Sequence, residues 1–255
     1  MKPQRGLKLW AVLFWLLAWQ LAAMALDREI LLASPLRALS RLGALAVRAD
    51  FWLAVGRSLL RIGGGFALGL VAGVALAVPA ARRRWLRELL SPLMLAVRSV
   101  PVASFVILAL VWVSSRHLAV LIVFLMVLPV IYLNVLGGIQ RLDPKLDEMA
   151  RVFRVPPVRR ALKVALPQLM PAFLNGCELA LGLCWKAGVA AEVIGMPKGS
   201  IGERLQQAKV YLDTPDLFAW TAVIVAVSWA FGRLTLRVLD AAGRALSGMP
   251  RRTGR

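Results

Sequence analysis

Long runs of apolar residues, separated by short polar segments, dominate the chain. Six runs approach or exceed the roughly 20 helical residues that cross a bilayer; they cover residues 9–26, 59–78, 89–113, 118–139, 166–194 and 217–239. The third and fifth runs are longer than a bilayer requires, and such helices tilt, bend or extend beyond the lipid. The pattern predicts an all-α integral membrane protein with six transmembrane helices in a single domain, residues 1–255.

A first polar segment has the spacing of a short amphipathic helix. Residues 34–57 are too charged to span, but Pro35 can open a helix over about residues 35–47, whose apolar positions recur at helical spacing: Leu36, Leu39, Leu42, Leu45 and Ala46. We expect this helix to lie on the outer surface of the membrane. The N-terminal stretch of residues 1–26 has a basic start and no good cleavage site, so it is interpreted as an uncleaved first span.

Composition and charge support the membrane interpretation and orient the chain. Hydrophobic residues make up 60% and the mean hydropathy is +0.72, whereas soluble domains are about 45–50% apolar. The net charge is +19, but no soluble stretch is large enough to form a nucleic-acid-binding domain. One set of alternate loops and ends holds 20 Lys and Arg residues, and the other set holds 9. The richer set is predicted to be cytoplasmic, which places both termini inside.

The longest internal loop on the cytoplasmic side, residues 140–165, has a helix–turn–helix pattern. Apolar Leu146, Met149, Ala150 and Phe153 lie at i, i+3, i+4 and i+7, and Asp143 or Pro144 can begin the first helix. Pro156 disfavours a helical conformation at the residue before it. Pro157 can open a second short helix before Leu166-Pro167 leads into the fifth span, so we expect two helices over residues 144–165. A basic amphipathic loop lying on lipid headgroups is the alternative.

This loop resembles the EAA loop of ABC importer permeases. The resemblance rests on Glu148, Met149 and Ala150, a turn, and the Leu166-Pro167 pair that ends the loop. It implies that the short helices dock on a separate cytoplasmic ATPase, with contacts from Glu148, Met149, Ala150, Phe153, Arg154 and Pro157. The family usually has Gly where this chain has Arg154. Either the turn is made differently around residues 155–157, or Arg154 bears backbone strain.

Three further segments resemble the nitrate/sulfonate/taurine-type branch of these permeases, at residues 32–78, 98–112 and 185–205. The resemblance implies a type I ABC importer-like permease fold and a multi-pass protein of the bacterial plasma (inner) membrane. It also implies three protein partners: a cytoplasmic ABC ATPase, an extracellular or periplasmic solute-binding protein, and a second permease copy in a homodimer. The branch carries small oxyanions, sulfonates and vitamin precursors, so the cargo is left open.

Polar residues inside the predicted spans are candidates for the translocation path. They are Arg98, Pro101, Glu178, Lys186 and Glu192. Charges at membrane depth usually face a cavity or a partner, so Arg98 or Lys186 can favour an anionic cargo, and Arg98 can pair with Glu178. Pro101 is expected to bend the third span. The alternative is a set of structural ion pairs and a helix kink without a role in transport.

Small residues in the spans have structural interpretations. Gly65, Gly69 and Gly73 line one helix face, which lets another helix approach closely; packing within the chain is favoured over a dimer motif. Cys177 and Cys184 are about 10 Å apart along a helix, too far for a disulfide, and are interpreted as small apolar residues.

The chain lacks the motifs of an energy-converting enzyme. It has no G-x-x-x-x-G-K-[ST] phosphate loop, and its one histidine, His117, has no cysteine or acid cluster nearby. We therefore expect no catalytic residues, no metal and no cofactor, with ATP used by the partner subunit. A secondary transporter that needs no ATPase is the main alternative, although the spans show no convincing repeat. A structural or assembly membrane protein is a third possibility.

Overall fold

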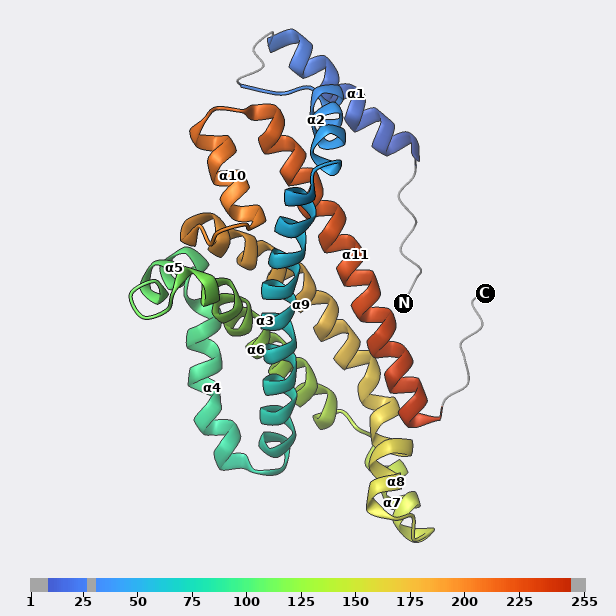
Figure 1. The fold of residues 1–255 in the computed structure, drawn as a ribbon. Coiled ribbons are helices and arrows are strands. Elements are labelled where there is room, and N and C mark those ends of the chain that lie inside the picture. The colour runs from blue at the N-terminus through green and yellow to red at the C-terminus, as the bar shows by residue number, and fades with distance from the viewer. Residues whose placement is uncertain (1–8, 27–30, 249–255) are drawn as a thin grey trace.

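The computed structural model describes residues 9–26 and 31–248, and all regular secondary structure in these ranges is helical (Figure 1). The elements are α1 (Leu9–Leu26), α2 (Pro35–Ala46), α3 (Ala49–Arg82), α4 (Arg84–Ser99), α5 (Val102–Ala109), α6 (Ser115–Gln140), α7 (Pro144–Val152), α8 (Pro157–Arg160), a π-helical turn η1 (Ala161–Ala165), α9 (Leu166–Gly195), α10 (Ile201–Val210) and α11 (Thr214–Ser247). The predicted cytoplasmic position of the termini concerns residues 1–8 and 249–255, which lie outside the described residues.

The centre of the molecule is built from α3, α6 and α9, which share the largest buried apolar cluster. The three glycines of the small-residue face lie against α6, where an added Cβ atom would come within 2.8 Å of a β-branched side chain. The glycines are Gly65, Gly69 and Gly73, and their neighbours are Val123, Val127 and Ile131. The prediction that this face packs within the chain is confirmed, and the face is not free for a second copy.

The third predicted span is broken. α4 ends at Ser99, α5 begins at Val102, and the two helices are bent by 98°. Pro101 lies between them; it lacks an amide hydrogen, and it disfavours the helical conformation at the preceding Val100. The bend expected at Pro101 is confirmed, because this run contains two helices, α4 and α5, rather than one straight helix.

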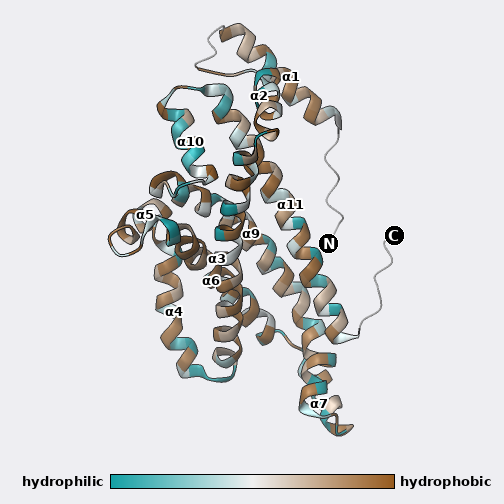
Figure 2. Cartoon of the chain, in the orientation of Figure 1, coloured by the Kyte–Doolittle hydropathy of each residue, from teal (hydrophilic) through white to brown (hydrophobic). Residues whose placement is uncertain are grey.

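Hydrophilic and hydrophobic residues are distributed unevenly over the helices. Hydrophilic residues gather on α7 at one end and on α10 at the other, while the long helices between them are mainly hydrophobic (Figure 2). Among the described helices, α3, α6 and α11 are long and apolar enough to cross a membrane, and the bent pair α4 and α5 makes a fourth candidate. α1 is a shorter apolar helix, and α9 carries three charged residues within its length.

Helix α2 occupies the segment where an outer amphipathic helix was expected. Ser34 caps its first turn by accepting a hydrogen bond from the amide of Arg37 at 3.3 Å. Arg41 Nε lies 2.6 Å from Asp216 Oδ1 at the start of α11, and its Nη2 lies 3.5 Å from Asp213 Oδ2. The hydrogen bond and the negative charge of Asp216 raise the pKa of the Arg41 guanidinium, and this ion pair ties α2 to α11.

Candidate functional site

The first candidate site is the hairpin formed by α7, α8 and η1, which protrudes at one end of the molecule (Figure 1). Asp143 caps α7 by accepting a hydrogen bond from the amide of Lys145 at 2.9 Å, and Pro144 occupies the first turn. At the other end, the amide of Val155 donates to the carbonyl of Ala150 at 2.9 Å, and that of Arg154 donates to Arg151 at 2.9 Å. These two bonds form the Schellman ending of a helix.

The turn after α7 is made by Arg154 itself. Its φ angle is 52°, in the left-handed region that favours glycine. The sequence left open whether the turn is made around residues 155–157 or by a strained backbone at Arg154. In the structure, Arg154 carries the strain. The two hydrogen bonds across the turn offset part of this strain.

Asp147 and Gln168 hold the hairpin in one shape, and neither is among the site residues predicted from the sequence. Asp147 pairs with Arg160 of α8 at 3.0 Å and with Arg151 of its own helix at 2.8 Å. Gln168 of α9 accepts a hydrogen bond from the amide of Asp143 at 2.9 Å and donates one to the carbonyl of Val164 at 2.9 Å. The spacing of Asp147 and Arg151 is visible in the sequence, but the contacts with Arg160 and Gln168 depend on the turn.

The second arm of the hairpin continues directly into a long core helix. The backbone stays helical from Pro157 through η1 into α9, and the amide of Leu166 bonds to the carbonyl of Ala161, five residues earlier. This wider turn accommodates Pro167 without ending the helix. The second helix expected after Pro157 is present as α8 and η1, and it continues without a break into α9.

The outer surface of the hairpin is both apolar and charged. Four apolar side chains are exposed: Met149, Val152, Phe153 and Val158. Val152 is 78% exposed and Phe153 is 74% exposed. Glu148, Arg154 and Pro157 are exposed as well. Ala150 is different, because it is only 2% exposed. Ala150 was expected to face an ATPase, but it is not accessible on this chain. The side of α7 that carries Ala150 packs toward η1.

Most of the predicted translocation-path residues lie at the surface. Arg98 and Pro101 are exposed, and among the described residues no salt bridge joins Arg98 to Glu178. The proposed pairing is wrong within one chain, because α4 packs against α3 and α6 rather than along α9. Glu178 and Lys186 instead line a groove of about 670 Å³ between α9 and α11.

Glu192 is the exception, because its side chain is completely buried. It accepts hydrogen bonds from Ser58 Oγ at 2.6 Å, from the amide of Gly202 at 3.3 Å and from Arg61 Nη1 at 3.4 Å. Ser58 Oγ also accepts a bond from the amide of Ile201 at 2.9 Å. This cluster joins α3, α9 and the start of α10, which gives Glu192 a structural position rather than a place on an open path.

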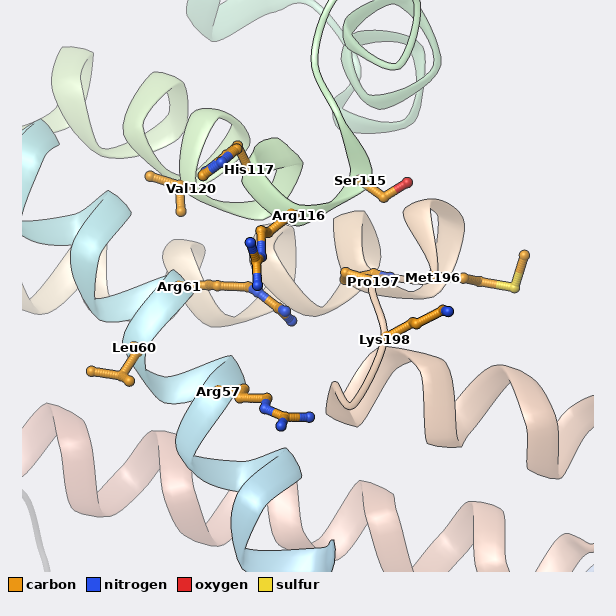
Figure 3. A pocket seen from close by; sticks show the side chains of 10 residues that line it. All are labelled: Arg57, Leu60, Arg61, Ser115, Arg116, His117, Val120, Met196, Pro197 and Lys198. Carbon is orange, nitrogen blue, oxygen red and sulfur yellow. The ribbon is translucent and has the colours of Figure 1, made fainter.

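A second candidate site is a basic cavity of about 870 Å³ at the opposite end of the long helices (Figure 3). It lies between α3, the start of α6 and the loop that connects α9 to α10. Its charged lining consists of Arg57, Arg61, Arg116 and Lys198, with His117 beside them. The hairpin follows the end of α6, so the two sites are separated by roughly the length of that 26-residue helix, about 39 Å.

These features define a class: a helical transport protein with several membrane-spanning helices and a rigid polar hairpin at one end. Residues 65–248 match the family described as binding-protein-dependent transport system inner membrane component. This range covers most of the chain, and the chain belongs to that family. It is therefore a multi-pass protein of the inner membrane, and the resemblance to ABC permeases of the nitrate and sulfonate type is confirmed.

Individual relatives share about three residues in ten with this chain. The bicarbonate transport system permease protein of Synechococcus elongatus is 28% identical over 145 residues, which are 56% of this chain and 52% of the relative. The nitrate import permease protein of Leptolyngbya laminosa is 29% identical over the same shares of the two chains. The putative aliphatic sulfonates transport permease protein of Bacillus subtilis is 30% identical over 70% of this chain and 63% of the relative. The chain thus spans between half and two thirds of the length of these relatives.

Proposed function

We propose that this chain is the membrane-spanning subunit of an ATP-driven importer and that the hairpin couples it to a separate cytoplasmic ATPase. The observation that carries the proposal is the exposed apolar surface of Met149, Val152 and Phe153 on a hairpin that is rigidly joined to α9. A helix with an apolar face and a charged rim fits a groove on a partner protein. Because α8, η1 and α9 form one rod, a push on the hairpin moves a core helix directly.

The orientation and the partners follow from this assignment. The hairpin lies in the cytoplasm, six segments cross the membrane, and both termini are cytoplasmic. α9 and the broken pair α4 and α5 are among the six; broken helices are tolerated where they are buried in protein or line a cavity. A second copy of the chain completes the translocation path, and a solute-binding protein delivers the cargo on the outer face. Glu178 and Lys186, which line one groove, remain the path residues that we favour.

The proposed cargo is a small anion. Bicarbonate, nitrate and aliphatic sulfonates, the solutes named for the relatives, are all anions. The chain itself carries a net charge of +19, and part of that charge lies at the end opposite the hairpin. Positive charge on a transport protein attracts anions and raises their local concentration.

Co-purification tests the coupling role. The tagged chain is expressed with candidate ABC ATPases from the same genome, and the amount of ATPase retained is measured. We expect Phe153→Asp to reduce it at least tenfold, because buried aromatic anchors contribute on the order of 2 kcal/mol or more to an interface. Val210→Asp is the matched control: Val210 is 66% exposed, but it lies on α10 at the other end of the molecule.

Two results would contradict the proposal. The first is equal retention of the ATPase by the two variants. The second is uptake that the purified chain alone drives from an ion gradient without ATP.

A further inference from the structure

The basic cavity collects positive charge without a matching negative lining. Arg57 and Arg61 reach into it from α3, Arg116 from the start of α6, and Lys198 from the loop after α9 (Figure 3). Among the described residues, only Arg61 of these four has a carboxylate partner, Glu192 at 3.4 Å. Arg57, Arg116 and Lys198 are exposed to the cavity and the solvent. Like charges gathered in this way repel one another, and a bound anion relieves that repulsion.

We propose that this cavity binds a small oxyanion on the outer face of the membrane, before the anion enters the translocation path. The proposal rests on the importer function, and it specifies where the chain itself recognises the cargo's charge. Guanidinium groups offer planar pairs of donors that match carboxylate, sulfonate or nitrate oxygens. A concave site lined by a few convergent polar groups suits a small molecule better than a flat protein surface.

The distribution of basic residues along the chain supports the assignment. Lys and Arg are disfavoured in outer loops of membrane proteins, and only 9 lie in the segments assigned to the outer face. Three of these, Arg57, Arg116 and Lys198, come from three different segments and line the same cavity. Topology alone does not require them there, and an anion site explains why packing brings them together.

Buried contacts hold together the backbone segments that carry Arg57 and Lys198. Ser58, one residue after Arg57, is buried and bonded to Glu192 of α9 and to the start of α10. Arg57 packs against Gly199 of the loop that carries Lys198. Ser114 begins α6 without a side-chain cap, so the positive end of the helix dipole also faces this end of the molecule. Pre-ordered donors lower the entropy cost of binding.

Equilibrium dialysis tests the site directly. The purified full-length chain in nanodiscs of phosphatidylcholine is dialysed against radiolabelled ethanesulfonate at constant ionic strength, with nitrate and bicarbonate as competitors. We expect saturable binding that is about tenfold weaker in Arg57→Gln and in Lys198→Gln, a factor equivalent to about 1.4 kcal/mol. Lys209→Gln is the control, because Lys209 is exposed on α10 but does not line the cavity, and it is expected to bind like the native chain.

The same dialysis separates a free anion from a lipid headgroup. Binding in phosphatidylcholine that persists when phosphatidylglycerol is added supports the site. The absence of saturable binding in phosphatidylcholine overturns the proposal. So does a result in which the control Lys209→Gln weakens binding as much as Arg57→Gln and Lys198→Gln do. A shift of the elution volume in gel filtration would identify a misfolded variant. In that case Arg116→Gln, which removes another charge from the cavity lining, is measured in place of the misfolded variant.

The anion-binding experiment and the ATPase co-purification can fail separately, so their failures are distinguishable. If the anion fails to bind while the ATPase still co-purifies, the cavity proposal is wrong and the importer role stands. If the anion binds but the ATPase is not retained, the importer role fails, and the site then belongs to a protein of another class.

Discussion

Two acids on one helix show how strongly position decides the role of a residue. Glu178 and Glu192 both lie on α9, and their sequence neighbourhoods are similarly apolar. Glu178 is exposed in the groove beside α11, whereas Glu192 is fully buried and accepts three hydrogen bonds. A buried charge is tolerated only when it is paired and hydrogen-bonded, so the surroundings of Glu192 must be built for it.

Replacing these acids should therefore have different effects on stability. Glu192→Ala leaves Arg61 and Ser58 without their acceptor and should lower the free energy of unfolding by about 3 kcal/mol, as for a broken buried pair. Glu178→Ala should change it by less than about 0.5 kcal/mol, as for an exposed site. Thermal unfolding in detergent can be followed with a thiol-reactive dye. Cys177 and Cys184 are free thiols that stay buried in the folded chain, so they react with the dye only when the chain unfolds. Equal unfolding temperatures for the two variants would refute this assignment.

Arg154 shows what can be learned from a single departure in a motif. The missing glycine marks a position where the backbone has to turn, and the sequence alone leaves two solutions. The structure uses the left-handed conformation at Arg154 despite its side chain. It does so because Pro156 and Pro157 restrict the residues that follow, while the Val155 and Arg154 amides can still close the end of α7.

At the scale of whole elements, the close contact between α3 and α6 depends on the absence of side chains. α3 approaches α6 along Gly65, Gly69 and Gly73, and no Cβ atom fits in the gap without displacing α6. This contact is local in sequence on α3, since the three residues repeat every four positions. That is why the sequence pattern was sufficient to predict a close approach.

A pair of glycine substitutions tests this contact. Gly69→Ala places a Cβ atom 2.8 Å from that of Val127, and such overpacking costs about 1–3 kcal/mol. Gly64→Ala on the same helix meets nothing within 4 Å and should be neutral or slightly stabilising, because Ala favours the helix by up to about 1 kcal/mol. The unfolding temperatures of the two variants in detergent provide the measurement. A Gly69→Ala variant as stable as Gly64→Ala would show that α3 and α6 are farther apart.

The hairpin is an element whose boundaries were only partly predictable. Its first helix follows from Asp143, Pro144 and the apolar spacing, all of which are local signals. Its second arm was expected to lead into the fifth span at Leu166-Pro167, and the π-helical turn carries the helix through that pair without a break. Whether a proline ends a helix or is absorbed by it depends on the neighbouring turns, here the wider turn in which the amide of Leu166 bonds to the carbonyl of Ala161.

At the scale of the whole molecule, the hairpin and the basic cavity mark opposite ends of the same helices. α6 and α9 each run from one end to the other. The two sites therefore have to lie on opposite faces of the membrane if these helices span it. This geometric argument is independent of the bias of Lys and Arg toward the cytoplasm.

Cysteine labelling tests this orientation. The native cysteines, Cys177 and Cys184, are 0% exposed, so the native chain should not react with a membrane-impermeant maleimide. Val152→Cys on the hairpin should react only from the cytoplasmic face, and Met196→Cys at the cavity only from the outer face. These positions are 78% and 53% exposed. Labelling of both variants from the same face would disprove the proposed topology.

The sequence by itself was sufficient for the membrane class, the family resemblance, the first hairpin helix, the bend at Pro101 and the glycine contact. Each of these depends on hydrophobic periodicity, on proline or on residue spacing within one segment, and such signals act over a few residues. Only the tertiary structure decided that Glu192 is buried while Glu178 is not, and that Ala150 faces inward. It also brought Arg57, Arg116 and Lys198 to one cavity. Ala150 faces inward because the turn at Arg154 folds α7 back on η1. The burial of Glu192 and the basic cavity arise because α3, α6 and α9 pack together, and that packing joins residues more than 50 positions apart.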